Sequence, residues 1–131
     1  MKYSFFIIFM LILSVAYFFL PSKTSSIGEL GMQFEYMGCV GDWSDDQSIK
    51  TIITKEDTRN TSFLVQNPAT CGFDSASQAS YKIEGDTLIL SYKYDELDGA
   101  LAACICKYQS RFTFKDSPVN INHVEFHSQG S

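Results

Sequence analysis

The residues of this 131-residue chain whose type and spacing could support chemistry are its four cysteines, Cys39, Cys71, Cys104 and Cys106. The last two form a Cys-x-Cys pair inside Ala102–Lys115, where apolar and polar side chains alternate. Such alternation is typical of a β-strand with one buried face, so we expect both of these sulfur atoms to lie on the buried side. Thiols in this setting can form disulfides or bind a metal ion.

Disulfide formation is the interpretation that the spacing favours. The β-carbons of Cys104 and Cys106 would lie about 6.6 Å apart along a strand, whereas a disulfide needs about 3.8 Å. These two cysteines therefore pair with others, which leaves two arrangements open: Cys39–Cys104 with Cys71–Cys106, or Cys39–Cys106 with Cys71–Cys104. Each link would close a loop of tens of residues and contribute about 4 kcal/mol in the chain-entropy model.

The alternative is a metal site that combines Cys104 and Cys106 with His123 or His127, since thiolate and imidazole suit copper or zinc. The histidines are distant in sequence, and the usual Cys-x-x-Cys spacing is absent. An oxidising compartment would also compete for the thiols. We therefore expect no metal and no cofactor.

The sequence contains none of the common catalytic motifs that we looked for. Both histidines fall within its last nine residues, and no Gly-x-Ser-x-Gly, phosphate-binding loop, dinucleotide fingerprint or His-Glu-x-x-His motif occurs. A nucleophile needs a base and an orienting group within reach, and none of these patterns supplies them. The prediction is a protein that is not an enzyme.

A basic row lies on the polar face of the same stretch, formed by Lys107, Arg111 and Lys115. It is a candidate contact surface for an acidic partner or for lipid head groups. The alternative is a solvated face, or charges that discourage edge-to-edge pairing of strands.

The first 24 residues decide the compartment. Lys2 precedes an uninterrupted apolar run to Leu20, and the next charge is Lys23. About 20 such residues are enough to cross a bilayer as a helix, but the layout also fits a cleavable secretory signal. Residues 1–24 are therefore a signal peptide or a signal-anchor helix, and the uncleaved form would attach the protein to a membrane. Both alternatives export residues 25–131.

The net charge of the chain disfavours one class of binding partner. The chain holds 15 acidic against 10 basic residues, and two of the lysines flank the N-terminal run. An acidic field disfavours nonspecific binding to nucleic acid, but the sign of the charge alone names no partner. We expect a protein partner and no nucleic acid.

The rest of the chain shows strand patterns and no amphipathic helix after residue 25. Gly85-Asp86 separates two alternating runs and predicts a two-residue type II′ hairpin turn. Apolar parity changes between Ile121 and Val124, which predicts a β-bulge near Asn122-His123. The strands that we expect are one from Leu30 to near Gly38-Cys39, Ile49–Thr54, Ser62–Gln66, Ala79–Ile83, Leu88–Tyr94, Ala102–Lys115 and a last one in two parts, Val119–Ile121 and Val124–Phe126.

Many short strands at close spacing predict an all-β fold. We expect an antiparallel β-sandwich over residues 25–131, with a small β-barrel as the alternative, preceded by an N-terminal hydrophobic helix. The function that fits is an extracytoplasmic (periplasmic, cell-surface or secreted) disulfide-stabilised domain that binds a partner, as inhibitor or immunity proteins do. The metal-binding protein described above is the alternative.

Overall fold

The computed structural model describes residues 29–43, 48–95 and 102–129. The predicted signal peptide or anchor, and with it the N-terminal hydrophobic helix, lies outside these residues. Within the described ranges no helix is long and apolar enough to cross a membrane.

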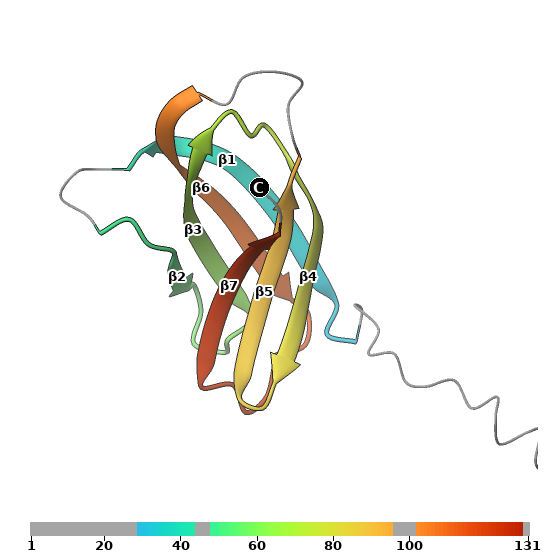
Figure 1. Cartoon of the computed structure of the whole chain (residues 1–131). Helices are drawn as coiled ribbons and strands as arrows, with labels where there is room; N and C mark the ends of the chain where they lie inside the picture. The colour runs from blue at the N-terminus through green and yellow to red at the C-terminus, as the bar shows by residue number, and fades with distance from the viewer. Residues whose placement is uncertain (1–28, 44–47, 96–101, 130–131) are drawn as a thin grey trace, which may run out of the picture.

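The described residues form an all-β fold of two sheets, neither of which closes into a barrel. Sheet A has the strand order β1-β6-β3-β2, and sheet B has the order β4-β5-β7 (Figure 1). The strands are β1 (Met32–Asp42), β2 (Ile52–Lys55), β3 (Ser62–Cys71), β4 (Ala76–Glu84), β5 (Thr87–Tyr94), β6 (Ala102–Phe114) and β7 (His123–Gln129).

Hydrophobic side chains from both sheets meet in one core. Strand β6 contributes every second residue, and β5 and β3 do the same. The alternation predicted for Ala102–Lys115 is confirmed from Cys106 onward, because these even positions are buried and the odd ones are not. The most deeply buried side chains are Phe63, Val65, Leu88, Leu90, Tyr92, Cys106, Tyr108, Ser110 and Phe112.

Strand β6 occupies the interior of sheet A. It pairs antiparallel with β1 on one side, Phe34 opposite Phe112, and with β3 on the other, Phe63 opposite the same Phe112. The long strand predicted over Ala102–Lys115 is therefore the strand that holds sheet A together.

The expectation of purely antiparallel sheets is wrong for one pair. Strand β7 lies parallel to β5, with Leu88 opposite Val124 and Leu90 opposite Phe126. The chain leaves sheet A at the end of β6 and crosses to sheet B, so β7 starts at the same end as β5. Antiparallel hairpins join neighbours through short turns, whereas this longer connection permits a parallel pair.

Strand β3 continues past Asn67-Pro68, where the prediction ended it. Pro68 lies opposite Lys107, and pairing with β6 extends to the end of the strand. Phe114 N–H donates to Thr61 O, so odd residues of β3 direct their backbone groups to β6 and even residues direct theirs away. Strand β2 pairs only as far as Gln66. Pro68 therefore faces an open edge, where its missing N–H costs no ladder hydrogen bond.

Strand β1 also runs further than predicted, because two irregularities carry it past Gly38. Its register against β6 shifts between Tyr36 and Gly38 and again between Cys39 and Asp42. Gly38 has a φ of 75°, a conformation that favours glycine. The bulges bend the strand without ending its pairing.

The predicted β4–β5 hairpin is confirmed. Glu84 pairs with Thr87, and Gly85 has the positive φ (62°) that a type II′ turn requires at its first central residue.

The predicted strand Val119–Ile121 and the bulge after it are wrong, because this segment is a loop. Asn120 has a φ of 59°, which breaks the extended conformation, and the N–H groups of Asn122 and His123 both donate to Asp86 O. Ile121 is buried in the core while Val119 is exposed. The change of parity in the sequence reflects this loop.

Tyrosine hydroxyls tie the segment after β3 to the core. Tyr108 Oη accepts from Gly72 N and Phe73 N and donates to Thr70 O, each at 3.1 Å, while Tyr36 Oη donates to Phe73 O at 3.1 Å. In contrast, Ser110 Oγ is buried and finds no partner among the described residues.

These two buried hydroxyls predict opposite responses to removal. Tyr108→Phe leaves two N–H groups and a carbonyl without a hydrogen-bond partner, so we expect the free energy of unfolding to fall by about 2–3 kcal/mol. Ser110→Ala removes an unsatisfied group and should be neutral or stabilising. Urea unfolding of both variants beside the wild type measures the difference, and equal losses would contradict the hydrogen-bond assignment.

Candidate functional site

All four cysteines form disulfides, as predicted. Cys39 bonds to Cys106 with Cα atoms 5.7 Å apart, and Cys71 bonds to Cys104 with Cα atoms 5.4 Å apart. This is the second of the two arrangements that the sequence left open. The bonds link β6 to β1 on one side and to β3 on the other, so that one end of sheet A is closed covalently.

The prediction that both sulfurs of the Cys-x-Cys pair face inward is wrong for Cys104, which is exposed, whereas Cys106 is fully buried. The register of β3 against β6 shifts after Thr70, and Cys71 pairs with Ala102. The alternation of β6 therefore fails at its first residues. Local sequence carries no signal for a register shift that a partner strand imposes.

The structure does not bring the alternative metal ligands together. Cys104 and Cys106 bond to different partners, and His123 and His127 belong to β7 in the other sheet. His127 Nε2 lies 3.3 Å from Glu125 Oε2, two residues away on the same exposed face. Among the described residues no group of three or more potential ligands gathers.

Trp43, which stands in the acidic sequence Asp42-Trp43-Ser44-Asp45-Asp46, is buried against sheet A. Its backbone N–H donates to Ile105 O and its indole Nε1 to Ser48 O, each at 3.3 Å. Lys107, the first residue of the predicted basic row, places Nζ 5.3 Å from the centre of the indole ring. A cation over an aromatic face is held there by the ring quadrupole.

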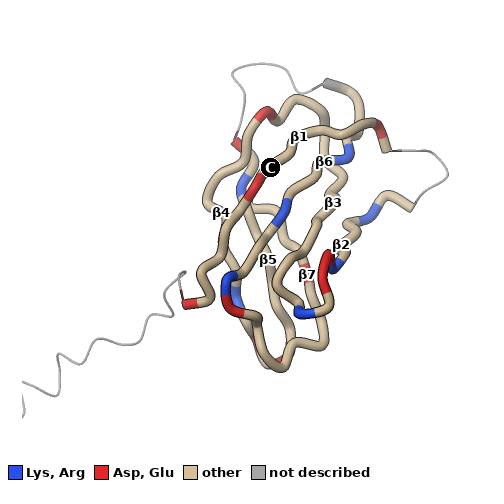
Figure 2. The backbone as a smooth tube through the Cα atoms, turned by 180° about the vertical axis from the view of Figure 1, so that it is seen from behind, with Lys and Arg blue, Asp and Glu red and all other residues tan. Residues whose placement is uncertain are grey.

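Arg111, the second residue of the row, is held between two carboxylates. It donates to Glu56 at 2.7 and 3.1 Å and to Glu35 at 2.8 Å. The hydrogen bond from Arg111 keeps the pKa of Glu56 below its ordinary value, with a further contribution from Ser62. One guanidinium beside two carboxylates carries no surplus positive charge. Basic and acidic positions are interspersed along the backbone as a whole (Figure 2).

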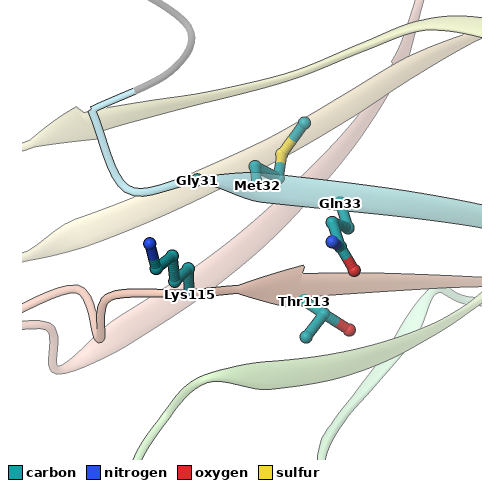
Figure 3. Close-up of a pocket in the computed structure, with 5 residues that line it drawn as sticks. All are labelled: Gly31, Met32, Gln33, Thr113 and Lys115. Carbon is teal, nitrogen blue, oxygen red and sulfur yellow. The ribbon is translucent and has the colours of Figure 1, made fainter.

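Lys115, the third residue, lies at the far end of the row beside a groove of about 490 Å³. The groove is lined by Gly31, Met32 and Gln33 from the start of β1 and by Thr113 and Lys115 from the end of β6 (Figure 3). A Cβ atom at Gly31 would come within 2.9 Å of Lys115 Cβ, so the absence of a side chain at this position keeps the groove open. The three basic residues therefore occupy three different environments.

Three exposed apolar side chains, which sequence reasoning missed, stand next to disulfide-bonded cysteines or next to the residue that holds Trp43. Val40 on β1 is 48% exposed, Ile105 on β6 is 41% exposed, and Ile49, next to the Ser48 that anchors Trp43, is 60% exposed. We call these three residues the disulfide-end patch. The sequence held a signal, because Ile105 begins an otherwise polar row of outward positions, but the position of Val40 depends on the bulges of β1.

Two tyrosines serve as hydrogen-bonding groups of the core. Burial raises the pKa of Tyr36 and of Tyr92 far above the ordinary value, so these core hydroxyls stay protonated and act as hydrogen-bonding groups. In comparisons with protein families, curated proteins and solved structures, nothing matches this chain. No relative therefore supplies a function for this chain, and the surface of the described residues is what bears on it.

The disulfide pairing predicts the outcome of cysteine removal. Each double variant, Cys39→Ala/Cys106→Ala or Cys71→Ala/Cys104→Ala, should lower the free energy of unfolding by about 4 kcal/mol in the chain-entropy model. The first should cost more, because its bond spans 67 residues against 33 and buries Cys106 fully. Peptide mapping without reductant checks the pairing, and a recovered Cys39–Cys104 peptide would contradict it.

The Arg111 cluster predicts a pH-dependent contribution to stability. Because the pKa of Glu56 is lowered in the folded state, its contribution is complete above the ordinary glutamate value of 4.5 and is lost as the pH falls through the lowered value. Arg111→Met should cause a small loss of stability at neutral pH, as exposed ion pairs do, and the loss should shrink in acid. Thermal unfolding at several pH values measures this, with Lys93→Met as an exposed control. A loss that does not change with pH would refute the linkage.

Proposed function

We propose that this protein is an exported, disulfide-stabilised domain of β-sandwich type that acts by binding a partner protein and carries out no reaction of its own. The contact surface in this proposal is the disulfide-end patch together with Lys107. An inhibitor or an immunity protein works in this way.

Export is supported by the bonding state of the cysteines. Two disulfides in a small β fold indicate an oxidising environment, since cytosolic thiols are kept reduced. The apolar run ahead of residue 24 gives the chain a route to such a compartment. Whether that run stays as a membrane anchor does not alter the contact surface.

The observation that carries the binding role is the position of the patch. Val40 and Ile105 are exposed next to the cysteines whose disulfides fix β6 to its neighbours, and Ile49 is exposed beside the Ser48 that accepts from Trp43. Exposed apolar residues that are concentrated on a rigid framework favour association, because they lose water without a large ordering cost. A protein partner fits best, since protein interfaces combine an apolar centre with a polar rim.

The polar residues beside the disulfide-end patch also favour a protein partner. Lys107 is held over Trp43 at the border of the patch, and Asp42 ends β1 close by. The chain has a formal net charge of −5, which opposes binding to a polyanion. We therefore keep Lys107 as the member of the predicted basic row that belongs to the contact surface, while Arg111 is already neutralised by its own carboxylates.

Crosslinking of the exported, full-length protein in its own cells tests the proposal. Val40→Glu and Ile105→Glu should each reduce recovery of the crosslinked partner by about tenfold or more, as expected for residues at the centre of an interface. Val119→Glu is the matched control, because Val119 is 75% exposed and lies beyond the end of β6, in the loop before β7.

The control should recover the partner as the wild type does. Equal loss in all three variants, or full recovery in the two patch variants, would overturn the assignment of this surface. Thermal unfolding of each purified variant confirms that the fold is retained.

A further inference from the structure

The free edges of the two sheets differ in how well they are protected against pairing with another strand. Native proteins protect edges with short strands, charged residues, proline or bulges. Strand β2 has four residues, β4 has an irregularity between Ser77 and Ser80, and β7 carries His123, Glu125 and His127 on one face. The first half of β1, Met32–Tyr36, has no bulge and no lysine or proline, and its one charged side chain, Glu35, is already paired with Arg111.

The backbone groups on this edge can be assigned from the ladder. Lys115 N–H donates to Gly31 O, so odd residues of β1 direct their backbone groups to β6 and even residues direct theirs outward. The outward group of Leu30 has a partner, because its N–H donates to Tyr81 Oη at 3.3 Å. The next outward positions are Met32, Phe34 and Tyr36, at an edge of sheet A to which no other described strand is paired.

The inward-facing side chains of this segment are incompletely covered. Met32, Phe34 and Tyr36 pack against the core but remain half-buried, whereas Phe112 opposite Phe34 is 0% exposed. A strand added beside β1 would extend sheet A and cover these three side chains. Backbone pairing and apolar burial would then act together, as in β-strand addition.

We propose that a second copy of this chain occupies this edge, with the two β1 strands antiparallel and Phe34 opposite Phe34 of the other copy. Met32 then lies opposite Tyr36, so that apolar side chains meet on the inner face. On the outer face, Gln33 lies opposite Glu35, which pairs an amide with a carboxylate.

The register proposed for the two β1 strands follows from the charge of Glu35 and from the irregularity after Tyr36. A shift by one residue on each strand toward Glu35 would place the two Glu35 side chains opposite each other, and like charges in that position are destabilising. The opposite shift would shorten the paired segment, because Leu30 already uses its outward N–H. The irregularity after Tyr36 ends the straight part of the strand in either case.

The groove at the start of β1 lies at the end of the paired segment. Met32, which lines this groove of about 490 Å³, stands opposite Tyr36 of the other copy in the proposed register (Figure 3). The last residue pair of the dimer edge therefore borders the groove.

Two substitutions at Gln33 test the proposal with opposite charges. Gln33 is exposed, so neither Gln33→Glu nor Gln33→Lys should disturb the fold. Gln33→Glu places a carboxylate opposite Glu35 twice in the dimer and should weaken association by about tenfold, whereas Gln33→Lys should preserve or strengthen it. Analytical ultracentrifugation of the full chain in detergent, across the micromolar range, measures the dissociation constants.

A wild-type chain that stays monomeric throughout this range would overturn the proposal. So would an equal response to the two substitutions, which would place the association elsewhere, for example in the N-terminal apolar run. A second measurement locates the interface: chains carrying Gln33→Cys and chains carrying Glu35→Cys should crosslink when they are mixed, and neither kind should do so to that extent alone. The dimer edge and the disulfide-end patch are tested by different variants, so one can fail without the other.

Discussion

The pairing of β6 with both of its neighbours is the constraint on which the rest of the structure depends. Its hydrogen bonds run to β1 and β3, its even residues supply the middle of the core, and both disulfides start from its first residues. A domain of about 100 residues buries a limited apolar area, so covalent links that restrict the unfolded chain contribute a large share of its stability. Closing one end of sheet A in this way also fixes the backbone on which Val40 and Ile105 are displayed.

The core is unusual in the number of hydroxyls that it accommodates. Tyr92 donates to Tyr94 at 3.0 Å, Asn67 donates to Tyr94 at 2.9 Å, and Thr51 donates to Asn67 at 2.7 Å. Aromatic rings fill the space between the sheets while their hydroxyls reach partners at its margins, which satisfies polar groups that would otherwise be costly to bury. Because these groups bond to specific partners, they favour one alignment of the two sheets over others.

The features that could be predicted from the sequence are those encoded by residues adjacent in the chain. The alternation of β6 from Cys106 onward and the Gly85-Asp86 turn are properties of adjacent residues, and both are confirmed. The continuation of β3 through Pro68, the parallel pairing of β7 and the outward position of Cys104 depend on which strand lies alongside, and no local pattern encodes that. Trp43 illustrates the same limit at the candidate site, since its burial follows from contacts with Ile105 and Ser48.

Strand β1 carries both of the surfaces that we propose for contact, and its glycines separate them. Before Gly38 the strand is straight and its edge is open, whereas beyond Gly38 the bulges turn it toward the disulfides and the exposed Val40. An edge that stayed straight over all eleven residues of β1 could pair in several registers and recruit further chains. Restricting the open part to Met32–Tyr36 leaves room for one two-fold pairing, which closes on itself instead of growing into a fibre. Two disulfide-end patches would then belong to one assembly, so that a partner with repeated epitopes would be held by both at once.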